Sequence, residues 1–542
     1  MARRIFFISV LAVPGAIVAL AQLWPPVLWS LVVVGPLLAR GLYDVTQTTH
    51  SLLRAYPLIG HGRYLFEAVR PEIQQYFVES DTNGRPYSRE FRSLIYQRAK
   101  EQNDTVPFGT LRDVDSIGYE WLTHSLCPIK PPQDEPRVRF GGPDCAQPYM
   151  ASHLNISAMS YGSMSGNAIL ALNAGARIGG FAHNTGEGGI SPYHLEHGGD
   201  LIWQIGTAYF GCRTPDGGFD ADAFEEHAKL DAVKMIEIKL SQGAKPAHGG
   251  ILPAAKVTAE IAAIRGVPMG QDVLSPAAHP AFDTPVGLLH FVTRLRNLSG
   301  GKPVGFKLCI GHRSEFLGIC KAMLETDILP DFITVDGAEG GTGAAPEELS
   351  NSVGMPMRDG VLFVHNALTG VGLRDSIRII AAGRIASGFH MVRAIALGAD
   401  TCNAARAMMF ALGCIQARRC NTNECPVGVA TQEPWRNQAL VPAHKSVRVA
   451  NYHRNTIEAF LELVSSNGLR TPDQITGRNV LRRVDATTIR PFSEVYEYLP
   501  QRCLLDPTTV PERWRDSWTR ASAARFGTAP WSMAPAAPIQ RT

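Results

Sequence analysis

The stretch CIQARRCNTNECP, residues 414–426, places three cysteines at the spacing C-x5-C-x4-C, with a proline directly after the last one. Cysteine thiolates bind iron–sulfur clusters through short loops of this kind, and a proline after the last cysteine is common. A zinc site is the alternative, but zinc needs a fourth ligand. Asn421 and Asn423 are poor zinc ligands, although a remote residue such as Cys402 could supply one. The spacing favours an iron–sulfur cluster. The predicted metal ligands are Cys414, Cys420 and Cys425.

Glycines and small residues end two successive apolar runs just before these cysteines, within residues 378–408. The first run ends at Gly383 and leads through Gly388 into a helical segment, and the second ends near Arg406. This pattern is typical of the phosphate site that follows the last two strands of a TIM barrel. Backbone N–H groups can reach a phosphate only where no side chain intervenes, which favours glycine. The alternative is that these glycines merely turn the chain.

A lysine interrupts the apolar run PVGFKLCI, residues 303–310, and an aspartate lies near the end of the run DFITVDG, residues 331–337. A buried lysine costs several kcal/mol unless it has a partner. Two partners fit Lys307: the anionic edge of a flavin ring, or a neighbouring carboxylate such as Asp336. Other runs also end in glycines or polar residues, which indicates a ligand that extends across one end of the strands.

Short β-branched runs alternate with amphipathic helical segments from about residue 150 to residue 470. Such alternation predicts parallel strands joined by crossover helices, either in a barrel or in an open doubly wound sheet. The glycine pattern described above favours the barrel. A Rossmann site is disfavoured because no G-x-G-x-x-G follows an early strand with an acidic residue about 20 positions later. The predicted strands include 233–240, 303–310, 331–337 and 376–383, and the predicted helices include 315–327 and 390–399.

The size and composition of the chain indicate one large folded domain with additions. With 542 residues the chain is too long for one ordinary core, and 45% hydrophobic residues fit a folded protein. The formal charge of +3 gives no indication of nucleic-acid binding. The 10 cysteines are dispersed apart from the cluster, which favours free thiols in a reducing compartment.

The N-terminus departs from this composition. Residues 5–24 carry no charge, and such a run is long enough to span a hydrocarbon core of roughly 30 Å. A second uncharged run follows a Pro-Pro pair and ends at Arg40. We interpret the two runs as a transmembrane hairpin with Arg3, Arg4 and Arg40 on one side, which places the rest of the chain in the cytoplasm. A cleaved signal peptide is the alternative, but it leaves the second run unexplained.

These patterns divide the chain into four predicted parts. They are a transmembrane hairpin (1–44), a mainly helical region (45–145), a barrel with the cysteine loop (146–470) and a tail folded over the barrel (471–542). The predicted fold class is therefore α/β: a (β/α)8 TIM barrel with an N-terminal helical region that is preceded by a membrane hairpin.

Five motifs together resemble the FMN-binding synthase domain of glutamate synthase, and they occur in the same order: NISAMSYGS, NTGEGG, QGAKPAHGG, DGAEGGTGAAP and CIQARRCNTNECPVGVATQ. The resemblance covers about residues 120–470. It implies a barrel that binds FMN and, through the three cysteines, a [3Fe–4S] cluster. It also implies a reaction in which 2-oxoglutarate and ammonia give 2-iminoglutarate, which is reduced at flavin N5 to L-glutamate.

The resemblance also assigns roles to individual positions. Lys245 and Arg265 match the residues that hold the 2-oxoglutarate carboxylates, and Glu187 matches a loop glutamate near the substrate and the ammonia path. Glu187 and Lys245 are the implied catalytic residues. With the phosphate-site residues described above, the expected FMN contacts are Ser160, Gln204, Lys307, Asp336, Gly341, Gly383, Gly388 and Arg406.

Departures from the family pattern bear on the substrate and the partners. Ile251 stands where the family usually has a glutamine near the substrate. The chain also contains no segment that resembles an amidotransferase domain or a dinucleotide-binding partner domain. The resemblance therefore implies a separate electron donor, such as ferredoxin or a reductase subunit. A separate amidotransferase could supply the ammonia.

Two other functions compete with glutamate synthesis. Some proteins similar to this domain transfer an amine between methylamine and glutamate to make N-methylglutamate, and Ile251 would suit such a changed pocket. A membrane-tethered electron-transfer or scaffold subunit without catalysis is the second alternative. The presence of Glu187, Lys245 and Arg265 argues against it.

Overall fold

The computed structural model describes residues 2–102 and 105–527. Their contacts group the chain into two compact units, residues 1–89 and residues 90–542. The predicted tail ends at residue 542, and its last part, residues 528–542, lies outside the described residues.

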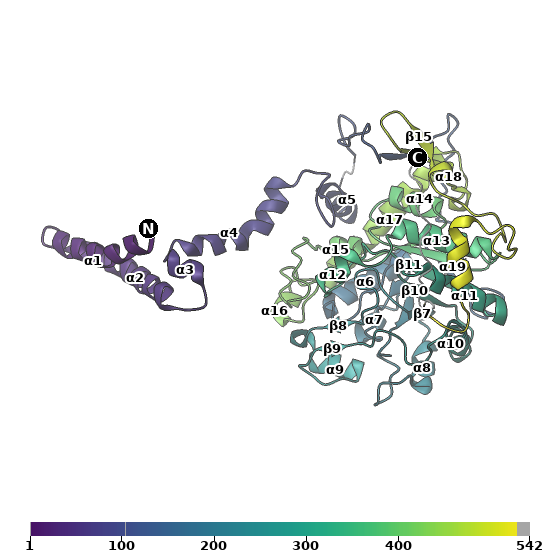
Figure 1. Cartoon of the computed structure of the whole chain (residues 1–542), viewed down its shortest axis with the longest axis horizontal. Helices are drawn as coiled ribbons and strands as arrows, with labels where there is room; N and C mark the ends of the chain where they lie inside the picture. Colours follow the sequence, from purple (N-terminus) through teal and green to yellow (C-terminus); the bar gives the residue numbers. More distant parts are fainter. Residues whose placement is uncertain (1, 103–104, 528–542) are drawn as a thin grey trace, which may run out of the picture. The chain divides into compact units, whose positions relative to one another are not determined.

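Eight parallel strands close into a barrel at the centre of the second unit (Figure 1). The strands are β4 (Leu154–Ile156), β5 (His183–Asn184), β6 (Leu201–Ile205), β7 (Val233–Lys239), β10 (Val304–Leu308), β11 (Phe332–Asp336), β12 (Arg378–Ala382) and β13 (Thr401–Ala404). Around the barrel they pair in the order β10-β11-β12-β13-β4-β5-β6-β7. All residues of β6, β10 and β11 are buried, as expected for parallel strands covered by helices. The barrel predicted from the sequence is confirmed.

At least one helix follows each barrel strand. These helices are α6 (Gly166–Gly179), α7 (Pro192–Leu195), α8 (Ala221–Ala228), α10 (Pro285–Leu298), α11 (Arg313–Thr326), α12 (Glu347–Ser352), α13 (Met357–Gly370), α14 (Gly388–Ala396) and α15 (Arg406–Leu412). Four of them begin with a side chain that accepts a hydrogen bond from the first turn, as N-caps do: Ser165, Asp220, Thr284 and Ser387. The predicted helices 315–327 and 390–399 correspond to α11 and α14.

The connection between β7 and β10 is the longest in the barrel and has structure of its own. It contains β8 (Ile251–Leu252), the 3₁₀ turn η3 (Ala254–Lys256), α9 (Ala259–Arg265) and β9 (Val273–Leu274). β8 and β9 pair antiparallel. The turn η3 and the end of α9 contact the loop after β4, so this connection brings distant residues to the barrel mouth.

Apolar side chains fill the opposite end of the barrel. The hairpin of β2 (Val138–Phe140) and β3 (Tyr149–Ala151) contributes Phe140 and Ala151 to a buried cluster with residues near the strand starts, including Ile202, Met235 and Phe332. Polar chemistry is therefore left to the end at which the parallel strands finish, as in other TIM barrels.

The remaining elements of the second unit surround the barrel. They are α5 (Arg89–Ala99), β1 (Glu120–Leu122), α16 (Pro434–Asn437), α17 (Pro442–Ser466), η4 (Pro472–Gln474), β14 (Val480–Arg483), β15 (Ile489–Pro491), α18 (Phe492–Val495) and α19 (Glu512–Arg520). The long helix α17 packs against α6, α14 and α15. The C-terminal strands join β1 in a three-stranded sheet, β1-β14-β15, and α19 packs against α11.

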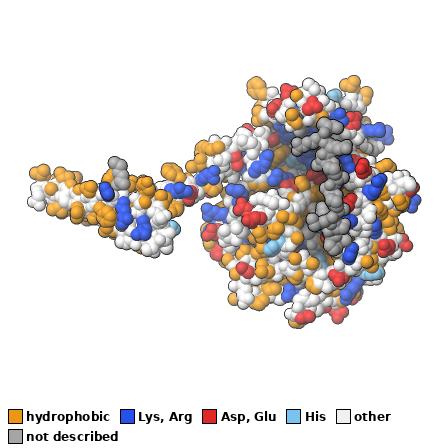
Figure 2. Space-filling model, viewed as in Figure 1, with side chains coloured by type: hydrophobic (Ala, Val, Ile, Leu, Met, Phe, Trp, Pro, Cys, Tyr) orange, Lys and Arg blue, Asp and Glu red, His pale blue; other side chains and the backbone are white. Residues whose placement is uncertain are grey.

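The first unit consists of helices: α1 (Ala2–Ala21), η1 (Pro25–Ser30), α2 (Leu31–Thr46), α3 (Ser51–Ala55), α4 (Gly60–Ile73) and η2 (Gln74–Val78). By length and composition, Ala2–Ala21 and Pro25–Thr46 could cross a membrane, with mean hydropathies of 2.2 and 1.4. A signal sequence near the N-terminus would meet the same criteria. Many of their apolar side chains are exposed (Figure 2), such as Leu11, Trp29 and Val32.

Candidate active site

The sequence-predicted site residues converge on the C-terminal end of the barrel. Most lie at the end of a strand, in the loop that follows, or in the connection between β7 and β10, whereas Gly388 and Arg406 begin helices α14 and α15 and the three cysteines follow α15. Glu187 follows β5, Lys245 follows β7, and Arg265 is the last residue of α9. These three residues are far apart in sequence, and the barrel brings their charges together.

Glu187 is at the centre of this group. Its Oε1 accepts a hydrogen bond from Lys239 Nζ at 2.7 Å, and 16% of its side chain is exposed. Burial alone would raise the pKa of Glu187, but the bond to Lys239 and the charges of Lys245 and Arg265 outweigh it and lower the pKa. A β-carbon at Gly250 would lie 2.5 Å from Oε1, so the second glycine of the HGG sequence lets the chain approach this carboxylate.

Lys245 links two loops at the barrel mouth. Its Nζ donates to the carbonyl of Ala344, in the loop after β11, at 2.7 Å, and only 2% of the residue is exposed. Burial and the charge of Lys239 lower the pKa of Lys245 to about 8, against the opposing effect of Glu187. The lysine is therefore a buried cation with one neutral partner, which leaves donor capacity for a ligand.

Arg265 reaches the loop that follows β4. Its Nη2 donates to the carbonyl of Tyr161 at 2.9 Å and lies 3.5 Å from Ser160 Oγ, and its guanidinium stacks 5.0 Å from the Phe210 ring centre. Burial lowers the pKa of Arg265 to about 10, although Glu187 opposes the shift. Its Nε is buried and has no hydrogen-bond partner among the described residues. A buried cation with an unused donor fits the binding of an anionic ligand.

Lys307 is paired with a carboxylate. Its Nζ lies 3.3 Å from Asp336 Oδ2, which also accepts a hydrogen bond from the backbone N–H of Gly243 at 3.0 Å. Burial disfavours the charged lysine, but Asp336 and then Glu237 outweigh it and raise the pKa of Lys307. The structure thus contains the carboxylate partner that the sequence suggested, and Asp336 contacts Lys307 directly.

Gln204 belongs to a polar network inside the barrel. Its Nε2 donates to Glu237 Oε1 at 2.6 Å, and the same oxygen accepts from Asn184 Nδ2 at 2.8 Å. Thr334 donates to the other oxygen, Oε2, at 2.6 Å. Glu237 was not among the predicted site residues, although a carboxylate in the buried run VKMIEIKL was a signal for such a network.

The glycines of the predicted phosphate site lie in closely packed surroundings, and at Gly388 packing alone explains the need for glycine. A β-carbon at Gly388 would lie 2.7 Å from the backbone nitrogen of Phe460 in α17, so glycine lets α14 approach α17. At Gly383 the nearest atom would be Cβ of Met357, at 2.8 Å. These contacts agree with tight packing around both loops, and they do not test phosphate binding.

Arg406 and Gly341 lie against each other. Arg406 Nη2 donates to the carbonyl of Glu339 at 2.6 Å, and a β-carbon at Gly341 would be 2.9 Å from Arg406 Nε. Two predicted FMN contacts, one after β11 and one after β13, are thereby brought together.

The three cysteines of the opening motif lie close enough to influence one another. Burial raises the pKa of Cys414 to about 12, and charges on Cys420 and Cys425 would raise it further. Burial and Cys425 also raise the pKa of Cys420. Three neighbouring thiolates therefore need compensating positive charge, which a metal cluster supplies. This chemistry fits a cluster, whose presence stays a prediction.

In the described part of the chain, no three His, Cys, Asp or Glu side chains are grouped so that they could hold a single metal ion, and this holds for Cys414, Cys420 and Cys425 as well. Burial raises the pKa of Cys402 to about 12 without a contribution from the three cysteines. All ten cysteines are free, as the composition predicted.

Comparisons with known proteins identify the family of this chain. The conserved region in glutamate synthase matches residues 140–470. The glutamate synthase large subunit-like protein YerD of Bacillus subtilis (strain 168) is 36% identical over 498 residues, covering 84% of this chain and 94% of its own. This chain belongs to the glutamate synthase family. The archaeal-type glutamate synthase (NADPH) of Thermotoga maritima is 36% identical over 405 residues, covering 74% of this chain and 76% of its own.

Membership of the glutamate synthase family makes this chain an oxidoreductase. Among solved structures, mandelate oxidase with (S)-4-hydroxymandelic acid matches with a TM-score of 0.42 and 15% identity, over 69% of this chain and 87% of that one.

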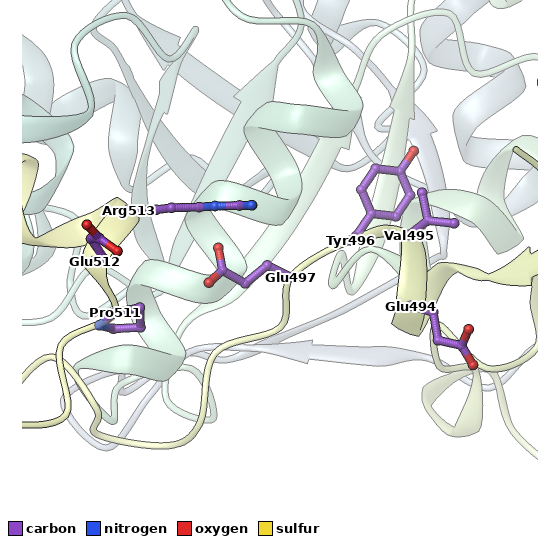
Figure 3. A pocket seen from close by; sticks show the side chains of 7 residues that line it. All are labelled: Glu494, Val495, Tyr496, Glu497, Pro511, Glu512 and Arg513. Atoms are coloured by element: carbon purple, nitrogen blue, oxygen red, sulfur yellow. The ribbon is translucent and has the colours of Figure 1, made fainter. Parts of the chain in front are cut away.

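A separate pocket lies away from the predicted site residues of this glutamate synthase homologue (Figure 3). Glu497 and Arg513 extend into it from opposite sides. None of the predicted site residues lines it. Its lining residues are Glu494, Val495, Tyr496, Glu497, Pro511, Glu512 and Arg513.

Proposed function

We propose that this protein is a flavin-dependent glutamate synthase that reductively aminates 2-oxoglutarate with ammonia to give L-glutamate. The observation that carries the proposal is the convergence of three cations on Glu187. Lys239, Lys245 and Arg265 contribute three positive charges against one negative charge, which leaves two. Two uncompensated positive charges match the two carboxylates of 2-oxoglutarate.

FMN is the proposed cofactor, and residues at the barrel mouth fit it. Lys307 is a buried cation inside the barrel, where it would face the ring, while Gly383 and Arg406 belong to the loops that would hold the phosphate. When bound, FMN supplies the hydride equivalent that reduces the imine carbon. Ser160 touches Arg265, so the same loop would contact both cofactor and substrate.

The side chains around Glu187 have distinct proposed tasks. Arg265 and Lys245 bind the carboxylates and fix the orientation of the 2-oxoglutarate carbonyl. Glu187, ionised and close to three cations, takes a proton from ammonium so that neutral ammonia attacks the carbonyl carbon. Loss of water then gives 2-iminoglutarate.

A direct experiment tests this reaction. The full chain is reduced anaerobically, and 2-oxoglutarate and ammonium are added while flavin absorbance is followed. The expected result is flavin reoxidation with formation of glutamate in equal amounts. Absence of both, in a preparation that contains flavin, would eliminate glutamate synthase activity and leave N-methylglutamate synthesis and the non-catalytic alternative.

Ile251 favours a second candidate function, the synthesis of N-methylglutamate from methylamine and glutamate. It follows Gly250, whose backbone lies beside Glu187, and it is half-buried at the start of β8. An apolar side chain there would accommodate a methyl group better than glutamine would. The measurement is N-methylglutamate formation from methylamine and glutamate; a protein that makes glutamate but no N-methylglutamate has the first function only.

Electrons are proposed to enter through a [3Fe–4S] cluster held by Cys414, Cys420 and Cys425. Cys414 and Cys420 are partly exposed, so a donor protein could approach them. Lys445 and Arg448 lie beside Gly413, and burial and mutual repulsion lower the pKa of Lys445. This positive charge fits an acidic one-electron donor such as a ferredoxin.

The donor proposal predicts a strong dependence on ionic strength. Reduction of the flavin by an acidic plant-type ferredoxin should slow as salt is raised, and Lys445→Glu should slow it further at low salt. Reduction by dithionite should be unaffected by either change. Equal ferredoxin rates at low and high salt would exclude electrostatic docking. A separate amidotransferase is the proposed source of ammonia where glutamine is the nitrogen donor.

A further inference from the structure

Lys256 is a buried lysine that the reaction proposed above does not use. It ends the turn η3, and only 1% of the residue is exposed. Its Nζ donates to the carbonyl of Ser163 at 3.0 Å and to that of Ala430 at 2.9 Å. Ser163 lies in the loop after β4, and Ala430 follows the last cysteine of the cysteine motif. One ammonium group therefore connects two loops more than 250 positions apart in sequence.

Further hydrogen bonds hold the same three segments together. Asn423, between the second and third cysteines, donates to the carbonyl of Ala255 at 3.0 Å. Gln432 donates to the carbonyls of Gly162 and Met164 at 3.0 and 2.8 Å. The loop after β4, the turn η3 and residues 423–432 thus form one junction, and Lys256 is its buried charge.

The charge of Lys256 also acts on the cysteines. Burial lowers its pKa to about 8, while Cys420 and Cys425 oppose that shift through their charges. No carboxylate contributes to this balance. A buried ammonium bound only to neutral carbonyls is costly unless an anionic group lies near it. Cysteine thiolates around a cluster provide such a group.

We propose that Lys256 is a positioning residue for the cysteine site, which holds the cysteine loop against the loop after β4 and supplies the positive charge next to Cys420 and Cys425. The inference rests on the cluster in the proposed function. The turn η3 lies between Lys245 and Arg265 in the chain. The junction therefore joins the β7–β10 connection, which holds these two proposed substrate-binding residues, to the cysteine loop through which electrons are proposed to enter. Its hydrogen bonds tune the cluster without touching the substrate.

The test compares Lys256→Gln and Lys256→Met in the full chain. Gln keeps a hydrogen-bond donor without the charge, and Met loses both. Lys302 offers a matched control, because it is also buried and donates to two backbone carbonyls, those of Ala228 and Leu230. The cysteines make no contribution to the pKa of Lys302, which burial lowers to about 8.

The readouts are iron and sulfide per flavin, the rate of iron release to bathophenanthroline disulfonate, and the midpoint potential of the cluster followed by electron paramagnetic resonance. Loss of a positive charge beside an anionic cluster disfavours the added electron, so both Lys256 variants should have a more negative potential than wild type. Lys256→Met should also release iron about 10-fold faster. Lys302→Met should match wild type in both measurements.

Two results together would overturn the proposal. Lys256→Gln would keep the wild-type midpoint potential, and Lys256→Gln or Lys256→Met would release iron at the wild-type rate. If Lys256→Met does not fold, the midpoint potential of Lys256→Gln alone settles the test. Equal changes in the Lys302 variant would also overturn it, since they would reflect general destabilisation. A wild-type protein without iron would instead remove the proposed cluster itself, whatever Lys256 does.

Discussion

At the scale of single residues, the charge around Glu187 is the feature that best explains the proposed chemistry. One carboxylate lies among Lys239, Lys245 and Arg265, and all four side chains are largely buried. A carboxylate in such surroundings stays ionised at neutral pH, which is the form that accepts a proton, and the cations that lower its pKa also make it a weaker base. The three cations exceed the single carboxylate by two positive charges, which favours a dianionic substrate.

Replacement of Glu187 by Gln removes the proton acceptor and keeps the shape of the side chain. We expect the rate of glutamate formation to fall by about 100-fold or more, because a general acid–base group is lost. The KM for 2-oxoglutarate should not rise, since the cations remain and a repelling carboxylate is gone. Steady-state kinetics measure both, with Glu347→Gln at the exposed start of α12 as the control. A rate within a few-fold of wild type would contradict the role of Glu187.

Lys245 gives the site a predicted pH dependence. Burial lowers its pKa to about 8, so the ammonium form, which attracts the substrate, is lost as pH rises through 8. The dissociation constant for 2-oxoglutarate should therefore increase about tenfold between pH 7 and pH 9. Flavin absorbance titrations of the oxidised protein without ammonium measure it. Lys245→Arg keeps the charge, so its binding should vary little over the same range; equally steep curves would contradict this assignment.

At the scale of elements, the closest approach in the predicted phosphate region joins α14 to α17. The helix α14 starts at Gly388, and no side chain separates its backbone from that of Phe460. Sequence reasoning attributed this glycine to phosphate binding, whereas the structure provides a packing reason that is independent of any ligand. Phosphate binding and helix packing predict different effects of replacing Gly388.

Gly388→Ala should destabilise the fold, because its new methyl group would lie 2.7 Å from the backbone nitrogen of Phe460. Overpacking of this kind costs about 1–3 kcal/mol. We expect a lower unfolding temperature in calorimetry with little change in FMN affinity of the folded protein. A large loss of FMN affinity at unchanged unfolding temperature would favour the phosphate role instead.

At the scale of the whole molecule, the two N-terminal helices expose apolar surface that a soluble protein would normally cover. We propose that they anchor the protein in the membrane as a hairpin, with the barrel in the cytoplasm. Deletion of residues 1–44 should move a flavin-coloured protein from the membrane to the soluble fraction. Sedimentation and flavin absorbance measure the change, and a truncated protein that still sediments with membranes would exclude this anchor.

Much of the fold was predictable because its signals are local. The runs around Lys307 and Asp336 are apolar and short, and the segments between them are amphipathic, so alternating strands and helices followed directly. The five motifs identified the family, and the resemblance assigned roles to Glu187, Lys245 and Arg265. The glycine pattern near Gly388 was interpreted as a phosphate site, and its close packing against Phe460 was not predicted.

The sequence by itself determined the fold class and the family, and it proposed the main charged residues of the candidate site. Only the tertiary structure decided which groups are partners: Lys239 with Glu187, Lys307 with Asp336, and Lys256 with two distant loops. The physical reason is that periodicity reports which residues are buried, whereas partners depend on how barrel closure joins segments that are far apart in sequence. A single buried lysine such as Lys256 has no periodic signal, and its function is visible only from its contacts.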